Sequence, residues 1–184
     1  THANAPMGVV AILGNHEKYH GLPTILQKYK TEATQTNLRL LVDENITLNY
    51  HGAEFQIVGV DYPILPDSRR RMAETAKLDY MQRSADKAFH GVKLGEWILC
   101  LTHHPDFFDL AAANHAGLSL AGHTHGGQVL PLGYTVGRLW FNYLKGWYQL
   151  PSSQLFVSVG MGHVWPYRLG VPPEIVTFTL HRKI

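Results

Sequence analysis

The chain has 184 residues, which is enough for one domain with a sizeable hydrophobic core. An apolar content of 45% and a charged content of 16% are typical of a globular protein, and a net charge of +2 is too small to argue for nucleic acid or an acidic partner. No stretch approaches the ~20 apolar residues that span a bilayer. Cys100, the single cysteine, excludes a disulfide within the chain and is expected to be a buried thiol. Because Thr1 is not a start methionine, we expect the chain to belong to something longer.

The first half of the chain alternates strand and helix patterns. An apolar run over 7–13 predicts a buried strand, and a glycine and a proline at 21 and 23 predict the start of a helix over 24–36. Three short strands with turns between them are expected at the positions 39–42, 46–50 and 55–60. Helical spacing of apolar residues predicts a helix over 70–89, with the basic run 69–71 as its solvated start.

The second half has the same alternation, with one irregular segment. Strands are expected at 97–102, 118–121, 155–159 and 174–181, the last of them near a sheet edge, and a helix is expected at 106–116. The segment 126–151 lacks periodicity and predicts a long ordered loop with short strands. Together these elements predict an α/β chain with a mixed sheet or two packed sheets.

Twelve histidines are a large number for this length and direct attention to metal chemistry. Three polar clusters follow strand-like runs, at the position where open α/β sheets place their ligand sites. These clusters are Gly14-Asn15-His16-Glu17, Thr102-His103-His104-Pro105 and Gly122-His123-Thr124-His125. We therefore expect one metal site that is assembled from distant parts of the sequence.

The residue types within the clusters suggest individual roles. His123 and His125 lie on a loop framed by glycines and fit two adjacent metals, although two hydrogen-bonded loop histidines are the alternative. Because adjacent side chains diverge, only one of His103 and His104 is expected to coordinate, while the other supports it or packs. Asn15 offers a hard carbonyl oxygen that suits Mn²⁺ or Mg²⁺.

Three further residues have two interpretations each. His16 cannot share the direction of Asn15, which leaves it available for proton transfer or for charge stabilisation. Glu17 fits a carboxylate that orients a ligand histidine, or the acidic first turn of a helix. Asp61 is favoured as a turn aspartate, with a substrate-pocket residue as the alternative.

The three clusters resemble the last three of the five motifs of the calcineurin-like metallophosphoesterases. The run 126–129 and the tail through 157–162, 168–170 and 173–175 resemble a bacterial, often membrane-associated or exported, subgroup of that family. The resemblance covers nearly all of the chain. It implies a single metallophosphoesterase domain over 1–184 that forms a four-layer αββα sandwich of mixed sheets with its N-terminal strands missing.

The resemblance also implies a chemistry. Two divalent metal ions (Mn, Fe, Zn or Mg) would lie about 3.5–4 Å apart, and a bridging hydroxide would attack the phosphorus of a phosphodiester or a phosphomonoester. Asn15, His103 and His123 would be metal ligands, His125 would bind the other metal, and His16 would assist the leaving oxygen or bind the phosphate. A lipid or a nucleotide ester is a candidate substrate.

The chain departs from the family in one respect, because the Asp-x-His and Gly-Asp-x-x-Asp motifs do not occur. The alternative functions are therefore a non-catalytic remnant or binding module, and an enzyme that another chain completes. His163 is a candidate pocket residue. Membrane association through the aromatic stretch 140–148, and a membrane-associated or exported location, are expectations from the resemblance, with core packing and the cytoplasm as alternatives. No specific nucleic-acid binding is expected.

Overall fold

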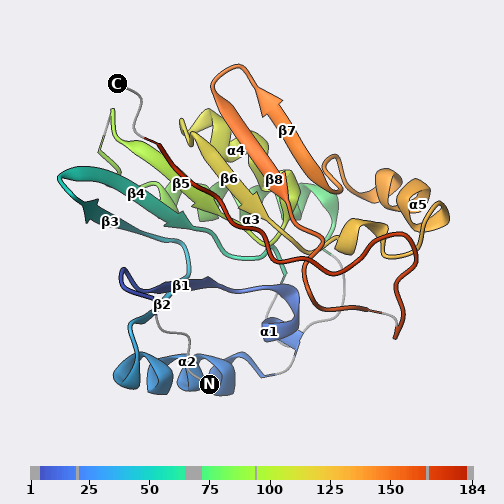
Figure 1. The fold of residues 1–184 in the computed structure, drawn as a ribbon, viewed down its shortest axis with the longest axis horizontal. Coiled ribbons are helices and arrows are strands. Elements are labelled where there is room, and N and C mark those ends of the chain that lie inside the picture. Colours follow the sequence, from blue (N-terminus) through green and yellow to red (C-terminus); the bar gives the residue numbers. More distant parts are fainter. Residues whose placement is uncertain (1–4, 20, 65–71, 94, 165, 182–184) are drawn as a thin grey trace.

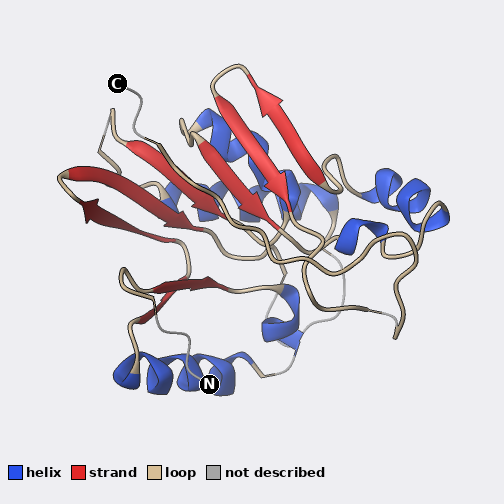
Figure 2. Cartoon of the chain, viewed as in Figure 1, coloured by secondary structure: helices blue, strands red, loops and turns tan. Residues whose placement is uncertain are grey.

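The computed structural model describes residues 5–19, 21–64, 72–93, 95–164 and 166–181. Figures 1 and 2 show a small and a large β-sheet, with helices on their outer sides. In chain order the elements are β1 (Val9–Ile12), α1 (Asn15–Tyr19), α2 (Leu22–Gln35), β2 (Leu38–Leu41), β3 (Glu44–Tyr50), β4 (Ala53–Gly59), α3 (Glu74–Ala88), β5 (Trp97–Leu101), η1 (Pro105–Phe107), α4 (Phe108–Ala113), β6 (Leu118–Ala121), η2 (His125–Gly127), α5 (Leu132–Trp140), β7 (Gly146–Leu150) and β8 (Ser153–Val157). The basic run 69–71 lies outside the described residues.

The strands form one small and one large sheet. β1 and β2 are a parallel pair, and the other strands form a mixed sheet in the order β3-β4-β5-β6-β8-β7. The four inner strands of the large sheet are parallel, and β3 and β7 add antiparallel edges. This arrangement aligns the carboxyl ends of β4, β5 and β6 at one edge, where the polar clusters were expected to meet.

The two sheets pack face to face, and Gly59 on β4 marks a close approach between them. A Cβ atom at this glycine would lie 2.4 Å from Leu41 Cβ and 3.1 Å from Ile12 Cγ2, so a side chain there would push the sheets apart. α2 lies on the outer side of β1 and β2, and α3 and α4 cover the outer face of the large sheet (Figure 1). The layers are therefore helix, sheet, sheet and helix, which confirms the predicted α/β sandwich of mixed sheets.

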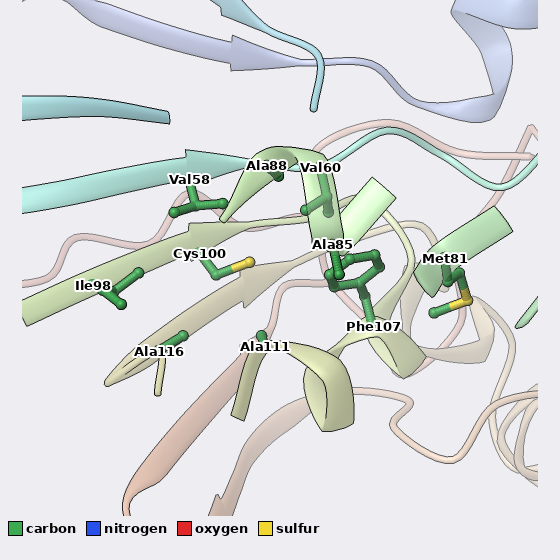
Figure 3. Close-up of a cluster of buried hydrophobic side chains, with 10 residues drawn as sticks. All are labelled: Val58, Val60, Met81, Ala85, Ala88, Ile98, Cys100, Phe107, Ala111 and Ala116. Atoms are coloured by element: carbon green, nitrogen blue, oxygen red, sulfur yellow. The ribbon is translucent and has the colours of Figure 1, made fainter. Parts of the chain in front are cut away.

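The main hydrophobic core lies between the large sheet and its helices (Figure 3). β4 and β5 contribute every second residue, and α3 contributes residues one and two turns apart, as the two periodicities require. The buried members are Val58, Val60, Met81, Ala85, Ala88, Ile98, Cys100, Phe107, Ala111 and Ala116. Cys100 is fully buried, as predicted, and desolvation raises the pKa of its thiol to about 12.

The segment predicted as a long loop contains a helix that the sequence reading missed. This helix, α5, occupies 132–140. The short strands that were expected in the segment are represented by β7. Gly133 and Gly137 lower the intrinsic helix propensity, because glycine costs about 1 kcal/mol relative to alanine in a helix interior. Packing of these glycines against the body of the protein overrides that cost, as described below.

The strand predicted over 174–181 is wrong, because this segment pairs with no strand within the described residues. The segment runs extended across the large sheet (Figure 1, dark red), and the ring of Phe178 packs edge-on against Trp147 and Phe156 at centroid distances of 5.7 and 5.4 Å. Pro172 and Pro173 precede it and cannot donate backbone hydrogen bonds. The alternation of apolar and polar residues over 174–181 therefore corresponds to an extended segment that aromatic packing holds in place.

Candidate metal centre

Three loops bring Asn15, His103 and His123 together, after β1, β5 and β6 respectively. Asn15 Oδ1 lies 2.9 Å from His103 Nε2, and His103 Nε2 lies 3.2 Å from His123 Nδ1. The two imidazole rings meet edge to face, with their centroids 4.9 Å apart. Three donor atoms from widely separated parts of the sequence are thus neighbours.

This spacing fits a bound divalent cation. Bonds from a metal to imidazole nitrogen or carboxamide oxygen are about 2.0–2.2 Å long, so two ligands at right angles lie about 3 Å apart. The distances of 2.9 and 3.2 Å match that value. Two imidazole nitrogens and one hard oxygen suit Mn²⁺, Fe²⁺, Zn²⁺ or Mg²⁺ better than a soft ion.

Burial keeps both histidines in the neutral form that binds metals. Desolvation lowers the pKa of His103 to about 4, although the Glu17 carboxylate opposes this shift. Desolvation also lowers the pKa of His123 to about 2, and the neighbouring His103 and His104 contribute in the same direction. Near neutral pH both rings therefore carry a free lone pair for a metal.

The backbone of the loops is shaped for this contact. A Cβ atom at Gly14 would lie 3.1 Å from His103 Nε2, so the glycine lets the loop after β1 approach the imidazole. His123 and His125 adopt φ values of 71° and 50°, in the left-handed region that non-glycine residues rarely occupy. The buried Thr124 between them donates to Leu144 O at 2.5 Å, which holds the loop in place.

His16 lies beside the cluster but is exposed to solvent. Its ring meets Tyr19 edge-on, with a centroid distance of 5.8 Å. A positive charge on His16 lowers the pKa of His103, His123 and His125, so His16 lies within electrostatic reach of all three. His16 is therefore accessible to a bound substrate and interacts electrostatically with the histidine cluster.

His125 is held from the other side by Arg168. The Nη2 atom of Arg168 lies 3.3 Å from His125 Nδ1 and also donates to the carbonyl oxygens of Val159 and Gly160 at 2.8 and 3.2 Å. Burial, followed by the charge of Arg168, lowers the pKa of His125. His163 is exposed and adds a small lowering through its own charge.

The cluster of Asn15, His103 and His123 contains no carboxylate. Among the described residues, no group of three or more His, Cys, Asp and Glu side chains is placed to hold a metal. The described donor set is therefore two histidines and the amide of Asn15.

His104 and Glu17 support the loops. His104 Nδ1 accepts a hydrogen bond from the Asp106 amide at 3.3 Å and caps η1, while its ring stacks on His123 at 5.6 Å. Burial lowers the pKa of His104 to about 3. Glu17 Oε2 accepts from the Gly14 amide at 2.8 Å and so closes the turn before α1.

Asp61 belongs to a buried ion pair with Lys18, which the sequence reading did not single out. Lys18 Nζ lies 2.5 Å from Asp61 Oδ2, and the two side chains are 1% and 10% exposed. Lys18 also donates to the Tyr62 carbonyl at 2.8 Å and to Tyr80 Oη at 2.9 Å, and Tyr80 donates a short hydrogen bond to Asp61. The pair joins α1, which carries Asn15, to the loop after β4.

Tyr62, in that same loop, reaches the metal cluster. Its hydroxyl lies 3.1 Å from His123 Nε2, on the opposite side of the imidazole from the Nδ1 atom that faces His103. Such a contact on the second nitrogen orients a ligand histidine. The sequence contained a usable signal, because Tyr62 follows a strand parallel to the two that carry the histidines.

A cavity of about 290 Å³ adjoins His123. Its aromatic walls include Tyr62, Trp140 and Phe141, and α3 adds the ion pair between Lys77 and Glu74, whose atoms lie 2.8 Å apart. The ring of Phe141 lies 5.3 Å from that of His123, so the cavity opens directly beside the cluster. An ester bound at the metal position could therefore place an apolar or planar substituent in this space.

Similar proteins cover almost the entire chain. An uncharacterized metallophosphoesterase of Campylobacter jejuni is 32% identical over 98% of this chain and 44% of its own length. A metallophosphoesterase of Aquifex aeolicus is 31% identical over 98% of this chain and 63% of its own length, and the metallophosphoesterase YkuE of Bacillus subtilis is 30% identical over 96% and 57%. The chain thus spans about half the length of the curated relatives that it matches.

No family model and no solved structure matches the chain. The relatives nevertheless share one designation and are similar along nearly all of its length. The donor atoms converge at the ends of parallel strands, where open α/β sheets place their ligand sites. Along nearly all of its length the chain is therefore similar to proteins that are designated metallophosphoesterases.

Proposed function

We propose that the protein hydrolyses a phosphate ester with the help of divalent metal. The observation that carries the proposal is the convergence of Asn15 Oδ1, His103 Nε2 and His123 Nδ1. The metallophosphoesterase relatives support the same class of reaction. When bound there, a divalent metal would supply Lewis-acid polarisation of a phosphoryl oxygen.

The chain's own residues have distinct tasks in this proposal. Tyr62 and the turn at Gly14 orient the ligands, so that little rearrangement is needed when a cation binds. His16, exposed beside the cluster, holds a proton that it donates to the leaving oxygen, or stabilises the charge of the bound phosphate. The cavity next to His123, with its aromatic walls, would receive the substituent of the ester.

Two finer features extend the proposal. The first is a second divalent ion with His125 among its ligands, because His125 lies on the same loop as His123 and within electrostatic reach of His103. The second is a preference for diesters over monoesters, for which the adjoining cavity offers room for a substituent.

The test combines metal stoichiometry with activity. The protein is stripped with a chelator, loaded separately with Mn²⁺ or Zn²⁺, analysed for bound metal, and assayed with bis(p-nitrophenyl) phosphate and p-nitrophenyl phosphate. His16→Ala and His123→Ala should each abolish metal-dependent turnover while leaving the circular dichroism spectrum unchanged. His90→Ala, which removes an exposed histidine at the end of α3, is the matched control. Wild-type rates in both site variants would refute the assignment.

A non-catalytic binding module is the second candidate. It is favoured by one observation, namely that no described carboxylate joins the histidine cluster to make a group of three. Binding of a single metal without hydrolysis of either substrate would select this candidate. Two metals per chain together with turnover would select the two-metal phosphoesterase.

A further inference from the structure

The apolar face of helix α5 points to solvent. Leu132, Val136, Leu139 and Trp140 follow the i, i+4, i+7, i+8 spacing of one helix face, which is normally the face that packs on the core. Here their exposed fractions are 69%, 43%, 80% and 58%, and no residue of α5 is buried. The helix therefore presents its apolar stripe outward.

Glycines explain how α5 is attached in this orientation. A Cβ atom at Gly133 would lie 1.8 Å from Gly127 O, and a Cβ atom at Gly137 would lie 2.7 Å from Leu144 Cδ1. These glycines, one turn apart, let the helix backbone rest directly on η2 and on the segment before β7. The outward face is thus fixed by close backbone packing on the inward face.

The neighbouring segment extends the apolar surface. Met161, Val164, Tyr167 and Leu169 are each 60–64% exposed. The Leu130 amide donates to Leu169 O, and the side chain of Gln128 donates to Tyr167 O and accepts from the Val164 amide. These bonds tie the segment to the residues just before α5. Figure 1 shows both segments at the same end of the molecule. We call the eight residues of the two segments the α5 face.

Within 110–173, the part of the sequence that contains the α5 face, every charged residue apart from histidine is cationic. All 14 acidic residues of the chain lie outside 110–173, whereas Arg138, Lys145 and Arg168 lie inside it. Arg138 is exposed on α5 itself, and Lys145 Nζ lies 5.6 Å from the centroid of the Tyr134 ring, on the same helix. Carboxylates from outside this window reach the segment after α5, where Asp106 accepts from the Asn142 amide and Asp109 accepts from the Tyr143 hydroxyl. The apolar stripe itself, with Leu, Val and Trp and with Arg138 and Lys145 beside it, is complementary to an anionic lipid interface.

We propose that the α5 face docks on the surface of an anionic lipid bilayer, with α5 lying in the interface plane. Within the described residues no helix is long and apolar enough to cross a membrane. Exposed apolar patches of this kind mark an interaction site on a globular protein. The exposed Arg138 on α5, and Lys145 beside the Tyr134 ring, favour an anionic lipid surface over a basic partner.

Docking would place the candidate metal centre near the bilayer surface. Trp140 belongs to the α5 face and also lines the cavity beside His123. The two features therefore share a wall, and one end of the cavity borders the docked surface. This consequence adds to the proposed hydrolysis but does not depend on it, because docking requires neither metal nor substrate.

The test is a vesicle flotation assay on the whole chain, performed with a chelator present and without substrate. We expect the protein to float with phosphatidylcholine–phosphatidylglycerol vesicles, to float less with phosphatidylcholine alone, and to be released by high salt. Leu139→Glu, at the most exposed position of the face, should weaken binding at least about tenfold. Arg138→Glu should weaken binding to the anionic vesicles only.

Tyr50→Glu is the matched control, because it places the same acidic residue at a 55% exposed apolar position at the end of β3. Its binding should equal that of the wild type. Thermal unfolding of Leu139→Glu verifies that this variant is folded. The proposal is overturned by an absence of flotation, by equal flotation with neutral vesicles, or by wild-type flotation of Leu139→Glu. A dimer that Leu139→Glu converts to a monomer, without vesicle binding, would assign the face to a second copy of the chain instead.

Discussion

The two sheets contribute to the same site from very different surroundings. The large sheet carries His103 and His123 above a core of fully buried residues shared with α3 and α4. The small sheet carries Asn15, yet every residue of β1 is only partly buried and α2 has no buried residue. One ligand of the centre therefore belongs to a layer that is packed far less tightly than the layer that holds the other two.

The difference indicates that the site depends on bridges between the layers. Three are visible, namely the close approach at Gly59, the Lys18–Asp61 ion pair, and the contact of Asn15 with His103. A metal bound to Asn15, His103 and His123 would add a fourth bridge, since a ligand that binds only the assembled state stabilises it. We expect the small sheet to be the part whose local stability responds most to metal.

Breaking the ion pair should have the largest effect. Asp61→Ala leaves the Lys18 charge buried without its carboxylate, at a cost of about 3–5 kcal/mol. That is a large share of the about 5–15 kcal/mol that stabilises a whole domain. Urea unfolding would measure the loss, and hydrogen exchange should locate it first in β1, β2 and α2.

The control for this prediction is Lys93→Ala, which breaks the surface ion pairs of Lys93 with Glu54 and Glu96, both at 3.2 Å. It should cost less than about 1 kcal/mol. The double variant Lys18→Met/Asp61→Leu should recover much of the loss, because it leaves no buried charge. Equal losses in Asp61→Ala and Lys93→Ala would show that the buried pair does not hold the layers together.

Removal of one candidate metal ligand should have the next largest effect, which is a loss of metal affinity. His103→Ala deletes the donor that lies between Asn15 and His123, so the dissociation constant for Mn²⁺ or Zn²⁺ should rise by more than the about 100-fold limit seen for outer-shell partners. Isothermal titration calorimetry of the stripped protein measures it. His115→Ala, at an exposed histidine after α4, is the control. Unchanged affinity in His103→Ala would place the metal elsewhere.

Acid should destabilise the metal-free protein through buried histidines on the large sheet. The pKa of His104 is lowered from about 6.5 to about 3 by burial, so the unfolded chain takes up a proton that the folded chain refuses. Stability is therefore unaffected above the unfolded pKa and falls as the pH drops below it. The expected cost at pH 5 is about 2 kcal/mol from this group.

His104→Asn isolates that contribution, because asparagine can still cap η1. Urea unfolding of the wild type and the variant at pH 7.5 and pH 5 should show a smaller acid loss in the variant. Burial of His103 and His123 acts in both proteins, and removal of the His104 ring also relieves part of the lowering of the His123 pKa, which reduces the acid loss in the same direction. If the wild type and the variant lose the same free energy of unfolding between pH 7.5 and pH 5, His104 is protonated in the folded state.

Much of the site could be predicted because strand ends and residue types are local signals. Asn15, His103 and His123 each follow an apolar run, and parallel strands bring such ends to one edge. The divergence of His103 and His104 also followed from backbone geometry, which sends one to Asn15 and the other to the cap of η1. These features need no knowledge of packing.

The remaining features depend on contacts between distant parts of the chain. Lys18 looks like an exposed helix residue, and its burial depends on a carboxylate 43 residues away. The glycines of α5 argue against a helix until Gly127 and Leu144 are known to lie against them. The segment 174–181 alternates as a strand does, but a pattern cannot reveal that a pairing partner is absent from the described residues.

The smallest expected effect tests whether Tyr62, in the loop after β4, raises metal affinity by orienting the His123 imidazole. Tyr62→Phe removes only the hydroxyl that lies 3.1 Å from His123 Nε2. Loss of such a partner should weaken metal binding by about tenfold, because the imidazole is then free to turn its Nδ1 away from His103. Tyr50→Phe, at an exposed tyrosine of β3, should leave affinity unchanged. If Tyr62→Phe instead lowers the free energy of unfolding but not the metal affinity, the tyrosine is a packing residue, and the bridge between the layers would rest on Lys18 and the ligands alone.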